Sequence, residues 1–391
     1  MVDKTSPKRY LFISLMGYKA ASGYLGGLVY KDLFLQEGHH VKFCSMNFPA
    51  LDSRIVHPTW FLKLLYYFGF RLLLVLIQRI GEFIHKYYLV ALSKRYDVVC
   101  LLKIQSESFV RMLKAHTDTR VVLFFGDAIW LTSPDFSGVV KRVDAVATDN
   151  EYTASYVNQF NSSCHIINDY PQLDEFDKHR GQVKKSDDGS LVLGWIGSPD
   201  TAYNLYEIWA PLERLFSQHP NLHLRLVGAG TDPRLIPRFE RVRFSILPFY
   251  SHSEMIDEIL RMDIGLFPLQ NIERSRVRGI LKACVYMSGG AVVVASPIGQ
   301  VAHLIKDGVN GMLAGGSDEW EQKLELLVSD ERRRRNIADE ALRTIRANFT
   351  KKQCYDKLMV ALDGQNYAFQ DGLLSAEQGR PVETVMNQGQ P

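Results

Sequence analysis

Short apolar runs alternate along most of the chain with segments that have the spacing of a helix. Residues 10–16 form the first run, a glycine-rich stretch and a helical pattern at 28–36 follow, and residues 40–44 form the second run. Three later runs are apolar at successive positions, at residues 97–102, 120–125 and 145–148. Such runs are typical of parallel strands that helices cover on both faces. The order of elements therefore predicts a doubly wound α/β domain.

Residues 173–190 interrupt this alternation because they are polar, charged and poor in aromatic residues. We interpret them as an interdomain linker. The alternation resumes at residue 191, with predicted strands at 191–196, 223–227, 242–247, 264–268 and 291–295 and an amphipathic helix at 201–218. The 391 residues are enough for two α/β domains, which we place at 1–180 and 190–350. Residues 364–391 lack periodicity and are predicted to be disordered.

Residues 54–95 are both apolar and basic. They contain seven Lys or Arg residues and one acidic residue, Glu82, and no uncharged run is longer than eight residues. A transmembrane helix needs about 20 residues with few charges, so a membrane span is not predicted. Two interpretations stay open: helices that cover the sheet of the first domain, or helices that lie on an anionic membrane surface.

The composition of the chain indicates its cellular compartment but says little about its function. The net charge of +3 is too small to indicate nucleic-acid binding. The five cysteines are far apart and form no C-x-x-C pair, which favours a reducing environment over disulfides or zinc. The polar residues 1–9 contain no signal-peptide core. We therefore expect a cytoplasmic protein.

Two glycine-containing turns could bring a ligand close to the backbone. Gly26 and Gly27 end the glycine-rich stretch 17–27, where a helix N-terminus would favour an anion, although many such turns bind nothing. Gly197 and Ser198 follow the first strand of the second domain, and would offer free N–H groups and a hydroxyl at the carboxyl edge of the sheet.

A cluster of basic residues follows the predicted strand at 264–268. Arg276, Arg278 and Lys282 lie before and within a predicted helix, and the last two are four residues apart, so they would share a face. Neighbouring cations repel each other, which is tolerable where they hold a diphosphate. The alternative is a solvated basic face.

Taken together, residues 191–350 resemble the retaining GT-B glycosyltransferases of family 4, also called glycosyltransferase group 1. The matching stretches are LGWIGSPDTAYNL, LRLVGAG, DIGLFPL, SRVRGILKACVYMSGGAVVVASPIG and IKDGVNGMLA, with looser likeness in RVVLFFGDAIW and DAVATDNEY. The resemblance implies an α/β protein of GT-B fold, in which two Rossmann-like doubly wound domains face each other across a cleft. It also implies that a helix at 351–363 crosses back to the first domain.

The resemblance implies roles for individual residues. The second domain would bind a nucleotide-sugar, a co-substrate rather than a cofactor, and the first domain mainly the acceptor. The residues implied near the donor are Arg278 and Lys282 at its phosphates, with Gly26, Gly27, Gly197, Ser198, Leu247, Arg276, Ile298 and Gly299 around it. Asp127 lies where the family often has an acidic residue near the acceptor, and is our candidate base. Its alternative role is to cap a loop.

Two valines depart from the pattern of the family. Val277 and Val285 occupy positions at which many members have a pair of glutamates eight residues apart. The hydrogen bonds that the first glutamate would make to sugar hydroxyls are therefore missing, which predicts altered recognition of the donor.

The predicted reaction transfers a sugar from a nucleotide-sugar to a glycan or lipid-linked acceptor. Arg278 and Lys282 would stabilise the departing nucleotide without a metal, since the sequence contains no D-x-D pair. The resemblance alone implies retention of the anomeric configuration. Two alternatives stay open: a non-catalytic nucleotide-sugar-binding or membrane-scaffold protein, which the two valines motivate, and a GT-B nucleotide-sugar epimerase.

Overall fold

The computed structural model describes residues 6–15, 24–47, 71–133, 135–183, 185, 189–231 and 242–364, with only the backbone at 71–75 and 77. Three segments singled out in the sequence lie outside this description: residues 17–23 of the glycine-rich stretch, residues 54–70 of the apolar and basic segment, and the tail from residue 365 onward.

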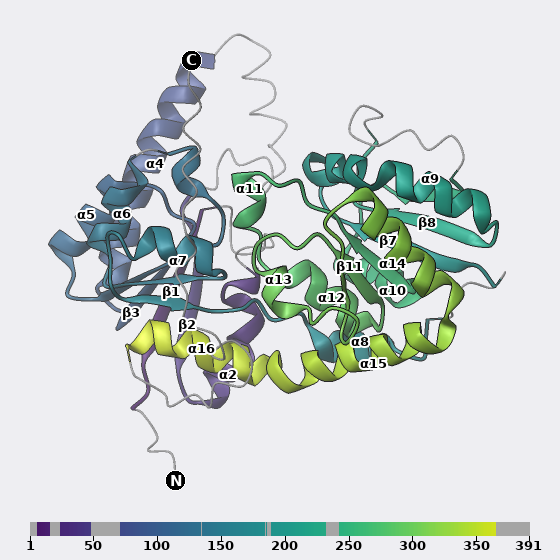
Figure 1. The fold of residues 1–391 in the computed structure, drawn as a ribbon. Helices are drawn as coiled ribbons and strands as arrows, with labels where there is room; N and C mark the ends of the chain where they lie inside the picture. The colour runs from purple at the N-terminus through teal and green to yellow at the C-terminus, as the bar shows by residue number, and fades with distance from the viewer. Residues whose placement is uncertain are drawn as a thin grey trace.

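The first domain is built on a six-stranded parallel sheet with the order β2-β1-β3-β4-β5-β6 (Figure 1). Its strands are β1 (Arg9–Ser14), β2 (His40–Ser45), β3 (Val98–Leu102), β4 (Arg120–Phe124), β5 (Ala145–Thr148) and β6 (Cys164–Ile166). Its helices are η1 (Leu28–Tyr30), α2 (Lys31–Gln36), α4 (Arg71–Ser93), α5 (Glu107–His116), η2 (Ile129–Leu131), α6 (Phe136–Arg142) and α7 (Glu151–Val157). β3 and β5 are buried at every position, as their apolar runs predicted.

The second domain repeats this design with the strand order β12-β11-β10-β7-β8-β9. Its strands are β7 (Leu191–Ile196), β8 (Leu222–Val227), β9 (Phe244–Leu247), β10 (Ile264–Phe267), β11 (Val292–Ala295) and β12 (Met312–Leu313). Its helices are η3 (Pro199–Ile208), α9 (Trp209–Gln218), α10 (His252–Arg261), α11 (Glu273–Arg276), α12 (Leu281–Gly289), α13 (Val301–Leu304), α14 (Ser317–Ser329) and α15 (Glu331–Asn348). Each sheet reverses its strand order once, between β1 and β3 and between β7 and β10, and open α/β sheets bind ligands at such points.

Two helices connect the domains. The last helix, α16 (Lys351–Asp363), packs against β3, β4, β5 and β6 of the first sheet, and lies below that domain in Figure 1. Arg120 on β4 fixes its end by donating from Nε to the carbonyl of Leu362 (2.8 Å). In the opposite direction, α8 (Leu173–His179) packs against α10 and α12 of the second domain.

The expectation that residues 173–190 form a linker is wrong for their first part. The charged residues of α8 hide an apolar face, because Leu173 and Phe176 are both buried. The predicted helix at 201–218 is also divided, into the 3-10 helix η3 and the α-helix α9. Pro211 explains the break because it has no N–H to donate to the carbonyl of Glu207, so a continuous α-helix cannot run through this point.

Helix α4 has one packed face and one exposed face. Leu89 and Val90 are buried, and the helix packs on α5. On the other side Leu76, Ile80, Phe83, Ile84, Tyr87 and Tyr88 are exposed. Among the described residues, no helix has the length and apolar character needed to cross a bilayer.

The hydroxyl of Tyr286 bridges β7 and β10 where the hydrogen bonds between these two strands end. The β7–β10 ladder pairs Gly194 with Gly265 and extends no further toward the carboxyl edge. Beyond it, the buried Tyr286 on α12 accepts a hydrogen bond from the N–H of Ile196 (2.8 Å) and donates to the carbonyl of Leu266 (3.3 Å). The ring fits because Gly265 has no side chain: a Cβ there would lie 2.5 Å from it.

We expect Tyr286→Phe to lower the free energy of unfolding by about 1–3 kcal/mol, the cost of leaving a buried N–H without a partner. Urea denaturation of the wild type and of Tyr286→Phe measures this cost. Tyr206→Phe, which alters an exposed tyrosine, is the control. Equal stability of the two variants would show that the Tyr286 hydroxyl does not support the edge of the sheet.

Candidate functional site

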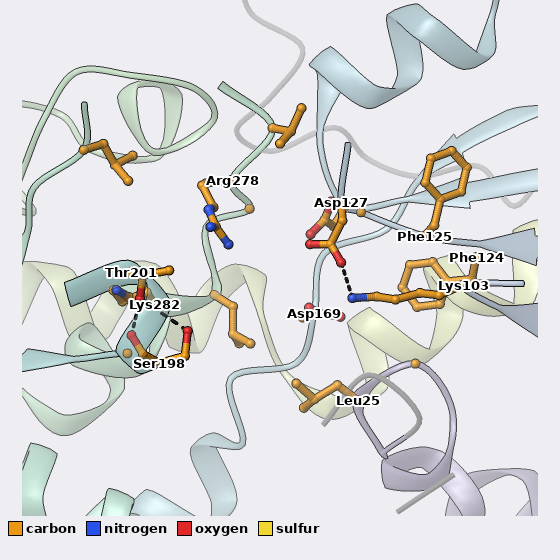
Figure 2. Close-up of a pocket in the computed structure, with 18 of the residues that line it drawn as sticks. Leu25, Lys103, Phe124, Phe125, Asp127, Asp169, Ser198, Thr201, Arg278 and Lys282 are labelled. Atoms are coloured by element: carbon orange, nitrogen blue, oxygen red, sulfur yellow. Dashed lines mark hydrogen bonds and ion pairs between the residues drawn. The ribbon is translucent and has the colours of Figure 1, made fainter. Parts of the chain in front are cut away.

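A cavity of about 560 Å³ lies between the carboxyl edges of the two sheets (Figure 2). The first domain lines it with Leu25, Gly26, Leu102, Lys103, Phe124, Phe125, Gly126, Asp127, Asp149 and Asp169. The second domain lines it with Gly197, Ser198, Thr201, Asn204, Phe267, Leu269, Val277, Arg278, Gly279, Leu281 and Lys282. A site of this size and composition can hold a small polar molecule between two walls of different charge.

The wall of the second domain carries two cations. Lys282 is in the first turn of α12, and its ammonium lies 4.8 Å from the ring centroid of Trp195 and 5.1 Å from that of Phe267. Burial, and then the neighbouring charge of Arg278, lower the pKa of Lys282 to about 7. Arg278 extends into the cavity from the loop before α12 (Figure 2). An anion between the two side chains would counteract this shift, because an opposite charge favours the protonated ammonium.

Beside the cations, the turn after β7 offers hydroxyl groups rather than the expected free N–H of Gly197. That N–H donates to the carbonyl of Val227 (3.0 Å), so this part of the sequence-based expectation is wrong. The hydroxyls of Ser198 and Thr201 lie 3.4 Å apart at the start of η3. Only glycine fits at position 197, where a Cβ would lie 2.6 Å from the ring of Trp195.

Among its described residues, the wall of the first domain carries three carboxylates and one lysine. Asp127 pairs with Lys103, and 60% of its side chain is exposed. Asp149 and Asp169 are set deeper. Burial, supplemented by nearby carboxylates, raises the pKa of Asp149 to about 6 and that of Asp169 to about 7. The two negative carboxylates repel each other, so the loss of a proton from one makes loss from the other harder. Near neutral pH the Asp149–Asp169 pair therefore titrates as a unit and retains a proton more readily than separate aspartates would.

The structure brings together six of the residues that the sequence suggested. Those lining the cavity are Gly26, Asp127, Gly197, Ser198, Arg278 and Lys282. Gly27, Leu247, Arg276, Ile298 and Gly299 are not among the lining residues.

Two of these five residues have other contacts, and a third lies at a turn. Gly27 lies against the rings of Phe12 and Phe43, and the guanidinium of Arg276 donates to the side chain of Asn271 (3.4 Å). Gly299 has a left-handed backbone (φ 68°) at a turn. Arg278 and Lys282 do share the cavity, but not one helical face, because α12 begins only at Leu281.

Sequence reasoning missed Lys103, Asp149 and Asp169. Each comes directly or shortly after a parallel strand, as Asp127 does, so the position of strand ends could have identified Lys103 and Asp149. Asp169 was harder to find because its strand, β6, has only three residues and is not apolar. Across the described ranges, no group of three or more His, Cys, Asp or Glu side chains is arranged to hold a metal ion.

Comparison with known proteins assigns this architecture. Residues 190–330 match the family described as "Glycosyl transferases group 1", a match that covers the second domain except α15. No curated protein sequence matches the chain.

Solved structures match over both domains. HepE of Anabaena, solved with UDP and glucose, is 15% identical, with a TM-score of 0.61 over 92% of this chain and 100% of its own. Sucrose-phosphate synthase of Thermosynechococcus elongatus is 13% identical, with a TM-score of 0.63 over 90% and 100%. An alpha-glucosyltransferase in complex with UDP and a 13-mer DNA is 12% identical, with a TM-score of 0.59 over 92% and 100%. The chain therefore has the GT-B fold, two Rossmann-like domains facing across a cleft.

The raised pKa values predict how stability depends on pH. An unfolded chain releases the protons of aspartate near pH 3.9, whereas Asp169 retains its proton to about pH 7. The folded state is therefore favoured below this window and loses stability as the pH rises through it.

Asp169→Asn cannot ionise, so we expect it to melt a few degrees above the wild type at pH 8. The difference should vanish toward pH 4. Thermal unfolding across this pH range measures the effect, and a difference that does not change with pH would contradict the assignment.

Proposed function

We propose that the protein is a glycosyltransferase that moves a sugar from a nucleotide-sugar donor to an acceptor hydroxyl. One observation carries the proposal: Arg278 and Lys282 enter the cavity from the second domain, opposite Asp127 and Asp169 of the first. Cations on one wall suit a diphosphate, and carboxylates on the other suit hydroxyl groups. The match to the group 1 family covers the domain that carries the cations.

The chemistry follows from where charge develops. Breaking the bond between the anomeric carbon and the diphosphate leaves negative charge on the nucleotide, while the sugar gains positive character. Arg278 and the protonated Lys282, whose ammonium is buried in the wall of the cavity, would stabilise the leaving group. We propose that the reaction needs no metal, because these two cations would stabilise the charge of the leaving group.

The acceptor side is the second half of the proposal. Asp127 is the most accessible of the three carboxylates and remains our candidate base. We propose a glycan or lipid-linked acceptor and retention of configuration, as in family 4. HepE has been solved with UDP-glucose, which makes UDP-sugars the first donors to test.

Replacing either cation tests whether Arg278 and Lys282 take part in sugar transfer. We expect Arg278→Ala and Lys282→Met each to lower the turnover of a UDP-, GDP-, ADP- or CMP-sugar by about 10²–10³, the effect of losing one electrostatic donor. Arg276→Ala is the matched control because its side chain lies two residues away and does not line the cavity.

The measurement is release of the nucleotide, a nucleoside diphosphate or, from a CMP-sugar, CMP, with and without acceptor. Equal losses in all three variants would contradict the role of Arg278 and Lys282. Tight donor binding without turnover in the wild type would favour the non-catalytic alternative, and a changed sugar that stays on its nucleotide would favour an epimerase.

The exposed face of α4 supports a peripheral position on an anionic membrane. Leu76, Ile80, Phe83, Ile84, Tyr87 and Tyr88 recur at helical spacing on this face, and all six are exposed. The basic residues Arg79, Lys86, Lys94 and Arg95 lie along the same helix or just after it. Apolar insertion combined with attraction to anionic lipid is the usual basis of such binding. A protein in this position would act on the cytoplasmic side of the membrane.

Flotation with vesicles tests this position. We expect the wild type to float with vesicles that contain anionic lipid, and Phe83→Ser/Tyr87→Ser to float several-fold less. A matched control is Leu131→Ser, which alters an exposed apolar residue outside α4. Flotation that is indifferent to lipid charge and to the α4 substitutions would refute the proposal.

A further inference from the structure

The turn between β5 and α7 joins the two walls of the cavity through Asn150. This side chain is 1% exposed. Its Nδ2 donates to Oδ1 of Asp149 (2.7 Å), to the carbonyl of Gly126 (3.2 Å) and, across the domain boundary, to the carbonyl of Val277 (3.0 Å). Its Oδ1 accepts from the N–H of Thr153 (2.7 Å) and so caps α7. One amide therefore binds the residue before Asp127 and the residue before Arg278.

The neighbouring Asp149 fills the space between the same two loops. A Cβ at Gly126 would lie 2.3 Å from Oδ1 of Asp149, and a Cβ at Gly279 would lie 2.5 Å from its Oδ2. Both distances are too short for any side chain. The carboxylate of Asp149 consequently lies directly against the backbone on either side of the domain boundary.

A third contact extends this connection. The hydroxyl of Tyr152 donates to Oε1 of Glu273 (3.0 Å), at the start of α11. Residues 149, 150 and 152 of the first domain thus contact residues 279, 277 and 273 of the second. We call residues 273–279, which include Arg278, the arginine loop.

We infer that Asn150 is a positioning residue that holds the arginine loop so that Arg278 faces the cavity. Arg278 lies close enough to Lys282 for the two charges to repel, and this repulsion favours movement of the loop away from α12. The neutral amide of Asn150 opposes that movement without adding charge. A residue of the acceptor domain would thereby set the affinity for the donor phosphates, without touching the donor.

The identity of the ligand in this inference rests on the proposed function, but the contact itself does not. Asn150→Ser is the variant of choice, because serine also caps helices while its shorter side chain cannot reach the carbonyl of Val277. Asp330→Ala is the matched control: it removes the cap of α15, where Asp330 accepts from the N–H of Arg333 (2.9 Å), and does not line the cavity.

Two measurements apply to each variant. The first is calorimetric affinity for UDP, GDP and ADP, using whichever the wild type binds best. We expect Asn150→Ser to weaken it about tenfold, as the loss of two ordinary hydrogen bonds would, and Asp330→Ala to leave it within twofold. The second is hydrogen exchange without ligand, which we expect to accelerate across residues 273–281 in Asn150→Ser alone. Unchanged affinity together with unchanged exchange would overturn the inference.

A double-mutant cycle distinguishes positioning from general weakening. If Asn150 acts through Arg278, Asn150→Ser should have little effect on affinity in an Arg278→Ala background, whereas additive losses would contradict that route. If the wild type binds no nucleotide, the proposed function fails, and the exchange measurement still decides whether Asn150 holds the loop.

Asn150→Asp provides the same test should Asn150→Ser fail to fold. It keeps the side-chain oxygen that caps α7 and removes the Nδ2 donor to the carbonyl of Val277. Faster exchange over residues 273–281 would support the inference, and unchanged exchange would overturn it.

Discussion

The site depends on keeping the ammonium of Lys282 largely out of water beside a second cation. Burial and the charge of Arg278 lower the pKa of Lys282 to about 7, so near neutral pH the ammonium holds its proton weakly. The faces of Trp195 and Phe267 compensate for part of the lost hydration. Such a site is suited to an anionic group, which the diphosphate of the proposed donor would supply.

The fold provides this arrangement by placing two sheet edges opposite each other. In each domain, side chains that follow the carboxyl ends of parallel strands point toward the other domain. The second domain contributes cations from the loop and helix after β10, whereas the first contributes carboxylates after β4, β5 and β6. Opposite charges thus face each other across the cavity, and α16 and the Asn150 contact hold the two edges together.

The sequence predicted the strands that are continuous apolar runs, and some of the residues that follow strands. β5 and β7 begin and end at the predicted residues, and Lys282, Arg278 and Asp127 all reach the cavity. The sequence could not reveal contacts that depend on tertiary geometry. From the sequence, Asn150 is recognisable only as a helix cap, because its hydrogen bond to the carbonyl of Val277 (3.0 Å) depends on how the domains pack. Similarly, the charged residues of α8 gave no sign that Leu173 and Phe176 are buried.

Proton uptake on ligand binding tests the central claim most directly. Calorimetric titration of UDP, GDP or ADP at pH 8, in buffers of different ionisation enthalpy, counts the protons that accompany binding. If a diphosphate binds at Lys282, its charge raises the pKa of the ammonium from about 7, so the complex should take up close to one proton, and affinity should fall as the pH rises above 7. Lys282→Met should abolish this uptake. Binding with no proton uptake, or with uptake that survives in Lys282→Met, would contradict the account.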